Sequence, residues 1–144
     1  MKIDIVKLRP TAVLPEYQTA GAAGADIHAC IDAPITLQPL ERRMIPTGLS
    51  MAIPIGYEVQ IRARSGMSIK HGITMVNGIG TIDADYRGEV GVLAINLGQE
   101  AFTIEPGMRI AQMVVAKYET IGWNEVEILD ETDRGVGGYG SSGS

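Results

Sequence analysis

The stretch from Gly80 to Val92, "GTIDADYRGEVGV", places two aspartates, a tyrosine, an arginine and a glutamate between glycines. Asp83 and Asp85 are one residue apart, so on a strand their side chains would point to the same face. Two carboxylates on one face repel each other unless a cation or a polar ligand lies between them. The spacing therefore predicts that Asp83 and Asp85 belong to a site that binds a ligand or handles a proton.

Four further stretches combine charged or amide side chains with small residues: "AGADIHA" (23–29), "ARSGMS" (63–68), "GMRIAQM" (107–113) and "RGVGGYGSSG" (134–143). Taken singly, each has an ordinary structural interpretation. Asp26 suits a turn, Ser65 a helix cap after Arg64, and Arg109 and Gln112 the polar positions of a buried strand, while the glycine-rich end suits a flexible terminus.

Together with "NGIGTIDADYRGE" (77–89), these stretches resemble, in order and spacing, the five motifs of the trimeric deoxyuridine triphosphate nucleotidohydrolases, the dUTPases. The resemblance runs from about Ile3 to the last residues. It implies hydrolysis of dUTP to dUMP and pyrophosphate by attack of water on the α-phosphate, which removes dUTP from the nucleotide pool and supplies dUMP for thymidylate synthesis. It also implies Mg²⁺ as cofactor and a homotrimer whose active sites are shared between subunits.

The resemblance assigns Asp83 as the base that activates water and Arg64 as a second catalytic residue, while Asp85 would orient neighbouring groups. The segment 77–83 would form a β-hairpin that reads the uracil edge, and Tyr86 would lie under the deoxyribose and exclude a 2′-hydroxyl. Asn carries both a donor and an acceptor, and glycines allow close backbone approach, so the residue types permit this. The substrate-binding residues that the resemblance implies are Arg64, Ser65, Gly66, Asn77, Gly80, Thr81, Ile82, Asp83, Tyr86, Gly91, Arg109, Gln112, Arg134, Tyr139 and Gly140.

The triphosphate and its metal need cationic and oxygen partners. Guanidinium groups suit phosphate oxygens. Mg²⁺ prefers oxygen ligands and keeps several waters, so the triphosphate itself would be the main ligand of the metal. By resemblance, Asp26 would hold one of the metal's waters or brace Arg64. Arg134 would reach the γ-phosphate while Tyr139, a Phe in many family members, stacks over the uracil.

Two other functions are considered beside this one. The first is a dCTP deaminase-like enzyme of the same fold, whose site requires a glutamate acting on the pyrimidine ring. The second is a non-catalytic dUTP-binding sensor that signals through ordering of its C-terminal arm. The hydrolase-type motif around Asp83 and the presence of Arg64 and Arg134 favour the hydrolase.

The elements that position these residues are mostly strands. "YEVQIRA" (57–63) alternates apolar and polar residues, and "VGVLAINL" and "RIAQMVVAKY" are apolar runs between turn residues. "SGMSIKHG" is the one short helix candidate, with Ser65 as its cap. We expect an all-β, jelly-roll-like barrel or sandwich over residues 1–133, with at most one short helix, and a flexible glycine-rich arm over 134–144 that closes over the site.

The composition of the chain argues against several classes of function. The 144 residues are 45% hydrophobic and 20% charged with a formal net charge of −5, which argues against broad nucleic-acid binding. No apolar run approaches the ~20 residues of a membrane span, and no signal or transit peptide is recognised at the N-terminus. A single cysteine, Cys30, and two histidines argue against a disulfide framework or a His-based zinc site, and we expect Cys30 and His71 to be packing or turn residues. We expect a cytoplasmic protein that binds neither nucleic acid nor membrane.

Overall fold

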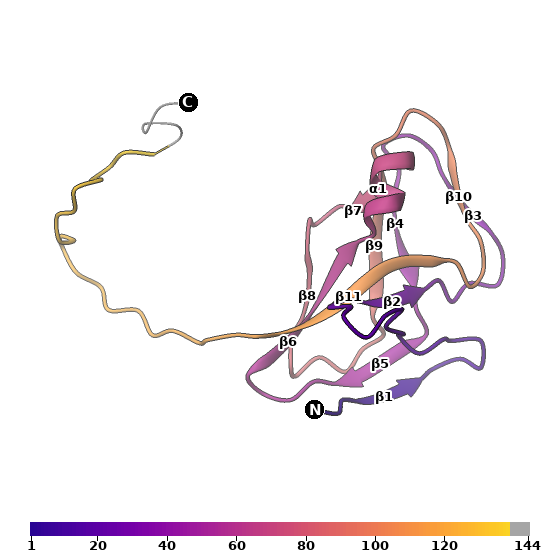
Figure 1. The fold of residues 1–144 in the computed structure, drawn as a ribbon, viewed down its shortest axis with the longest axis horizontal. Coiled ribbons are helices and arrows are strands. Elements are labelled where there is room, and N and C mark those ends of the chain that lie inside the picture. Colours follow the sequence, from indigo (N-terminus) through magenta and orange to yellow (C-terminus); the bar gives the residue numbers. More distant parts are fainter. Residues whose placement is uncertain (139–144) are drawn as a thin grey trace.

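The computed structural model describes residues 1–138, and almost all of its regular structure is β (Figure 1). One short helix, α1 (Ser65–His71), lies between β6 and β7. The strands are β1 (Asp4–Lys7), β2 (Ala25–His28), β3 (Ile35–Leu37), β4 (Arg42–Pro46), β5 (Leu49–Ala52), β6 (Tyr57–Ala63), β7 (Ile73–Met75), β8 (Gly80–Ile82), β9 (Gly91–Asn96), β10 (Phe102–Ile104) and β11 (Arg109–Lys117). The expectation of an all-β chain with one short helix is confirmed.

Two antiparallel sheets enclose the core. The larger has the order β2-β11-β6-β8 and the smaller the order β4-β9-β7, while β1 pairs with β5 and β3 with β10. Val59 and Ile61 of β6 are buried while Gln60 between them is not, which confirms the alternation seen in the sequence. These side chains pack in one buried cluster with Ile45 of β4 and Val92 of β9, so the core joins the two sheets.

Helix α1 ends before Gly72 as the sequence predicts, but it begins differently from that expectation. Its cap position is Arg64, whose backbone is extended (φ −83°, ψ 125°), and no side chain caps the first turn. Ser65 is therefore the first helical residue, and the prediction that it caps the helix is wrong. The helix ends at Gly72, which has φ 70° and donates its N–H to Ser68 O. A Cβ there would lie 2.7 Å from Gly98 Cα, so glycine is required.

The segment between β8 and β9 crosses from one sheet to the other. β8 pairs with β6 only as far as Ile82, and the chain then turns, with Tyr86 N–H donating to Asp83 O at 3.2 Å. The prediction that Asp83 and Asp85 lie on one strand face is therefore wrong, because the chain has to leave the first sheet to reach β9 in the second. Both residues nevertheless line one cavity of about 600 Å³, together with Arg87.

The predicted hairpin over residues 77–83 also differs from what the structure shows. β7 pairs with β9, whereas β8 pairs with β6, so residues 76–79 connect two sheets and are not the tip of a paired hairpin. The turn itself is tight: Gly78 has φ 71° and donates its N–H to Met75 O. The connection thus keeps the close backbone approach expected from its glycines without a hairpin ladder.

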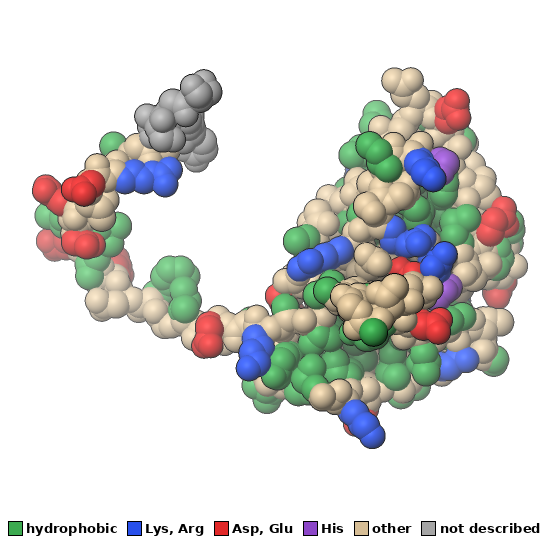
Figure 2. All heavy atoms as spheres, viewed as in Figure 1, with side chains coloured by type: hydrophobic (Ala, Val, Ile, Leu, Met, Phe, Trp, Pro, Cys, Tyr) green, Lys and Arg blue, Asp and Glu red, His purple; other side chains and the backbone are tan. Residues whose placement is uncertain are grey.

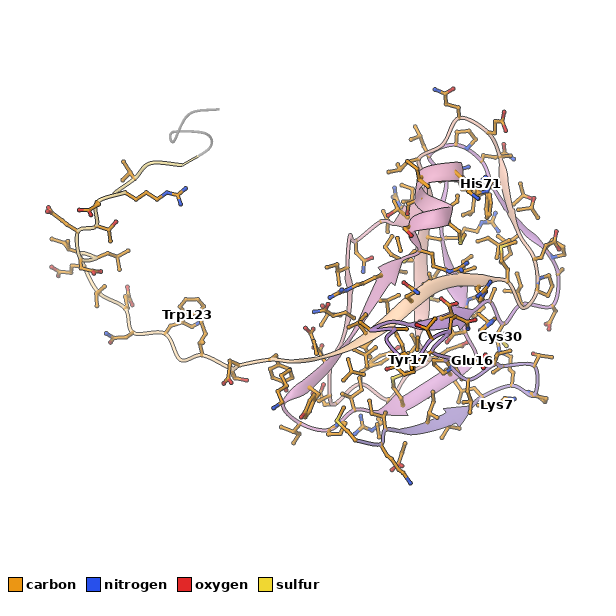
Figure 3. All side chains as sticks on the ribbon, viewed as in Figure 1. Lys7, Glu16, Tyr17, Cys30, His71 and Trp123 are labelled. Carbon is orange, nitrogen blue, oxygen red and sulfur yellow. The ribbon has the colours of Figure 1, made fainter. Side chains whose placement is uncertain are left out.

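Among the described residues, β11 is the last strand. Residues 118–138 contain no helix or strand, and Figure 1 shows them running away from the rest of the molecule. This segment exposes Ile121, Trp123, Ile128 and Leu129, and Trp123 is 90% exposed. Figure 3 shows the Trp123 side chain on this extended segment, clear of the strands. Within residues 1–138 no helix is long and apolar enough to span a membrane.

Candidate active site

A buried carboxylate organises the residues predicted to bind phosphate. Asp26 on β2 is 1% exposed, and strand register places it opposite Gln112 on β11. Its Oδ2 accepts from Arg109 Nη1 at 3.0 Å and its Oδ1 from Gln112 Nε2 at 3.1 Å. Arg64 Nε lies 3.4 Å from Oδ1, and Arg64 Nη1 donates to Arg109 O at 3.1 Å. The structure therefore favours the bracing role for Asp26, because both oxygens already have side-chain partners.

This arrangement keeps two guanidinium groups together despite their like charge. The buried carboxylate of Asp26 offsets part of their positive charge. The side chains of Arg64 and Arg109 are more accessible, at 27% and 44% exposed. Both arginines line a cavity of about 310 Å³, together with Gly66 and Lys70. Figure 2 shows basic side chains on the face between α1 and the β2–β11 pair. Donors in this geometry suit a multiply charged oxyanion such as a phosphate chain.

Three neighbours of the cluster add polar groups but no charge. Ser65 and Gly66 are exposed at the start of α1, next to Arg64. Burial lowers the pKa of His28, which faces Arg109 across the strand pair, and its Nδ1 is buried without a hydrogen-bond partner among residues 1–138. His28 is therefore neutral near pH 7 and adds no charge to the cluster.

The residues predicted to bind the nucleoside line a separate cavity of about 180 Å³. Six predicted residues meet there: Asn77, Gly80, Thr81, Ile82, Tyr86 and Gly91. Close packing shapes its walls, because a Cβ on Gly91 would lie 2.7 Å from Met44 Cγ and one on Gly80 would lie 3.2 Å from Ile61 Cβ. The lining combines apolar side chains such as Met44 and Leu93 with polar ones such as Asn77 and Thr81, a combination common in small-molecule sites.

Asp83 directly follows Ile82, a lining residue of the nucleoside cavity, but does not itself line that cavity. It is exposed, and it faces the larger cavity that it shares with Asp85 and Arg87. The nucleoside cavity and the cavity around Arg64 have no lining residue in common. One chain therefore carries two groups of predicted site residues that are not joined in a single pocket.

Arg134, the predicted arm residue that the structure describes, lies apart from both groups. Arg134 is exposed on the extended segment, and its Nε donates to Gly137 O at 2.8 Å. The predicted residues Tyr139 and Gly140 lie outside the described residues. The structure of one chain therefore does not bring Arg134 to Arg64 or Arg109.

The family model that matches the chain is that of the dUTPases, over residues 11–143. The chain belongs to the dUTPase family. A deoxyuridine 5′-triphosphate nucleotidohydrolase from Finegoldia magna is 54% identical over 99% of this chain and 99% of its own length. One from Roseobacter denitrificans is 62% identical over 90% of this chain and 86% of its own length.

A solved dUTPase structure extends this likeness to the fold. The dUTPase of Staphylococcus bacteriophage 80alpha with dUPNHPP superposes with a TM-score of 0.89 at 28% identity, covering 99% of both chains. The expected jelly-roll-like β fold is thereby confirmed, since it is the fold of the dUTPases.

Sequence reasoning did not name several residues that line the two cavities. Lys70 lines the cavity with Arg64, and the apolar side chains of Met44 and Leu93 line the nucleoside cavity. Lys70 lies six residues after Arg64 on α1, so its position in a helix that follows a phosphate motif was an available signal. The sequence contained no such signal for Met44 and Leu93, because these residues become neighbours only through the pairing of β4 with β9.

Proposed function

We propose that the chain hydrolyses dUTP to dUMP and pyrophosphate by attack of water on the α-phosphorus. The observation that carries this proposal is the cavity in which six of the predicted substrate-binding residues meet, with Asp83 next in the chain after Ile82 of its lining. Family membership and the cationic cluster around Asp26 support the same activity.

The nucleoside cavity is proposed to select the substrate. Asn77 and the backbone of β8 would pair with the uracil edge, and cytosine would leave buried donors and acceptors mispaired. Such mispairing discriminates by about 10⁴-fold or more in sites built on hydrogen bonds. Tyr86 would lie beside the deoxyribose, where its ring leaves no room for a 2′-hydroxyl.

Asp83 is proposed to act as the general base. It would accept a proton from a water molecule whose oxygen forms a bond to the α-phosphorus. The bond between the α-phosphorus and the oxygen bridging to the β-phosphate breaks, and pyrophosphate leaves with that oxygen. Exposure of Asp83 on a turn, within reach of solvent, supports this role.

The Asp26 cluster is proposed to hold the phosphates. Arg64 and Arg109 would donate to phosphate oxygens and neutralise charge that develops on the leaving group, with Ser65 and Gln112 adding neutral hydrogen bonds. Within residues 1–138 no three His, Cys, Asp or Glu side chains gather as a metal cage. Mg²⁺ would be held mainly by triphosphate oxygens and waters, and it would supply charge neutralisation there.

We further propose a homotrimer in which each active site draws on more than one chain. Support comes from the separation of the nucleoside cavity and the Asp26 cluster within one chain, and from the projecting segment 118–138. An apolar groove of about 350 Å³, lined by Ile3, Leu14 and Val115 among others, offers a surface on which a neighbour's exposed apolar side chains could pack. In this assembly residues 1–133 form the β unit and residues 134–144 the arm that closes over a site.

The first experiment is a coupled assay for pyrophosphate release from dUTP with Mg²⁺. Release of one pyrophosphate per dUMP is expected, with little activity on dCTP or UTP. Ammonia release from dCTP would identify a deaminase, and dUTP binding without turnover would identify a sensor. Sedimentation of the protein in the same buffer tests the trimer.

The role of Asp26 is tested by Asp26→Asn, which removes the charge that holds two arginines together. We expect KM for dUTP to rise by about tenfold or more, which corresponds to ~1.4 kcal/mol of lost binding. Glu16→Gln is the matched control, because the Glu16 backbone bridges to Asp26 while its side chain is exposed. Unchanged KM in Asp26→Asn, with the same fold by circular dichroism, would contradict the bracing role.

The role of Tyr86 is tested by Tyr86→Ala, which opens space beside the proposed sugar position. We expect kcat/KM for UTP to rise by about tenfold or more relative to that for dUTP. Tyr86→Phe keeps the ring and should change this ratio much less. A Tyr86→Ala enzyme that still ignores UTP while hydrolysing dUTP would make Tyr86 a packing residue.

A further inference from the structure

Tyr86 is only partly enclosed by the rest of the molecule. It lies on the turn between β8 and β9, outside any strand, and is 45% exposed, so surrounding side chains do not enclose its ring. Its hydroxyl donates to the backbone carbonyl of Glu89 at 3.0 Å. A residue whose ring is to exclude a single hydroxyl group has to be fixed more firmly than such exposure alone provides.

The Tyr86 ring occupies space that a side chain at position 88 would fill, and Gly88 has no side chain. A Cβ at position 88 would clash with Tyr86 Oη and lie 2.5 Å from Tyr86 Cζ. The backbone of Gly88 is not in the left-handed region, so alanine is conformationally permitted there. The atoms in conflict belong to the far end of a side chain, so an added methyl group would displace the ring and leave the backbone in place.

Glu89, which supplies the accepting carbonyl, is anchored from outside the turn. Its Oε1 accepts from Arg9 Nη2 at 2.6 Å and from the Gly48 N–H at 2.7 Å. Arg9 lies 80 residues earlier in the chain and also donates to Cys30 O at 2.9 Å. The hydrogen bond from Arg9 to Glu89 raises the pKa of Arg9, which keeps the guanidinium charged.

Val90, which follows Glu89, is hydrogen-bonded to residues beside Gly48, where β4 connects to β5. Val90 O accepts from Thr47 Oγ1 at 2.6 Å, and Val90 N–H donates to Leu49 O at 2.8 Å. The Glu89 carbonyl, which accepts from the Tyr86 hydroxyl, is therefore held through two groups. The Glu89 side chain bonds to Gly48, and Val90 bonds to Thr47 and Leu49. The Tyr86 ring takes its position from this anchor and from the space above Gly88.

We infer that Gly88, Glu89 and Arg9 are positioning residues for sugar selectivity: they hold the Tyr86 ring where it excludes a 2′-hydroxyl. Arg9 acts through Glu89 and Tyr86 and need not touch the substrate, whereas Glu89 also lines the nucleoside cavity. The inference rests on the proposed function, since it takes Tyr86 as the residue beside the 2′-carbon.

The test measures the ratio of kcat/KM for UTP to that for dUTP, which loss of stability alone would not change. Gly88→Ala should raise this ratio by about tenfold or more, and Arg9→Ala by a smaller factor close to that of Tyr86→Phe. Arg9→Lys keeps the charge and should restore part of the selectivity. In the double variant Arg9→Ala/Tyr86→Phe the two effects should not add, because both act on the same hydrogen bond.

Two matched controls separate positioning from general damage. Gly21→Ala makes the same chemical change at a site where an added Cβ meets nothing within 4 Å. Arg43→Ala removes another arginine paired with a glutamate, the Arg43–Glu41 pair at 2.8 Å. Neither should change the UTP to dUTP ratio.

The outcomes also separate this inference from the proposed function. If Tyr86→Ala raises the ratio while Gly88→Ala and Arg9→Ala leave it unchanged, the anchor has no role and the inference is overturned. If Tyr86→Ala also leaves the ratio unchanged, the steric role of Tyr86 fails and the inference fails with it, while dUTP hydrolysis stands. Should Gly88→Ala not fold, the two Arg9 variants decide the question.

Discussion

Asp83→Asn should bind dUTP with nearly unchanged affinity and hydrolyse it slowly, with kcat lowered by about 10²–10⁴-fold. The amide keeps the size of the carboxylate but cannot accept the proton of the attacking water. The proposed contacts to the uracil come from the nucleoside cavity, which Asp83 does not line, so they should persist. Single-turnover kinetics with a binding assay for a non-hydrolysable dUTP analogue separate the two effects.

Asp85→Asn is the matched control for this prediction. Asp85 lies on the same turn, is equally exposed, and lines the same cavity as Asp83, so the substitution makes an identical chemical change nearby. We expect a much smaller loss of kcat. A near-normal kcat for Asp83→Asn together with a large loss for Asp85→Asn would make Asp85 the base.

The strands of the core could be predicted from the sequence because burial on one face of a sheet leaves a period of two. β6 agrees with the predicted segment from Tyr57 to Ala63 residue for residue. The same reasoning failed for Asp83 and Asp85, since a period of two holds only while strand pairing continues. Pairing of β8 stops at Ile82 because the next strand belongs to the other sheet, which is a property of the topology and not of the local residues.

The candidate site shows the same limit. The motif residues could be named from the sequence, but nothing local indicates that Asp26 sits between Arg64, Arg109 and Gln112. Asp26 and Arg109 are 83 residues apart, and the register between β2 and β11 brings them together. The anchor of Tyr86 is hidden for the same reason, because Arg9 and Glu89 meet only through the fold.

A chain truncated after Asp133 should keep its fold yet lose most of its turnover, with kcat/KM for dUTP lowered on the order of 10²-fold or more. The fold should survive because the hydrogen bonds of Arg134 and Gly135 are local, reaching Gly137 and Thr132. The turnover should fall because the truncated chain lacks the guanidinium proposed for the γ-phosphate. Circular dichroism tests the fold, sedimentation tests the proposed trimer, which should also persist, and the pyrophosphate assay tests the loss of turnover.

Arg134→Ala and Arg134→Lys in the full-length chain show whether that loss comes from the guanidinium. A charge-assisted hydrogen bond contributes about 1.5–3 kcal/mol, so Arg134→Ala should account for a large part of the loss. Lysine keeps the charge without the two-pronged geometry and should fall between alanine and arginine. Equal activity of all three variants would exclude a phosphate contact by Arg134.

Ordering of the arm should depend on the triphosphate. Residues 134–138 have little apolar surface to offset an ordering cost of ~1–2 kcal/mol per residue, so a bound γ-phosphate has to supply the missing stabilisation. NMR order parameters at Gly137 and Gly138 should rise with a non-hydrolysable dUTP analogue and Mg²⁺, and rise less with dUMP, which lacks the outer phosphates. Equal order in the free, dUMP-bound and analogue-bound states, or full activity of the truncated chain, would contradict closure, because an arm that closes on the γ-phosphate must respond to its presence.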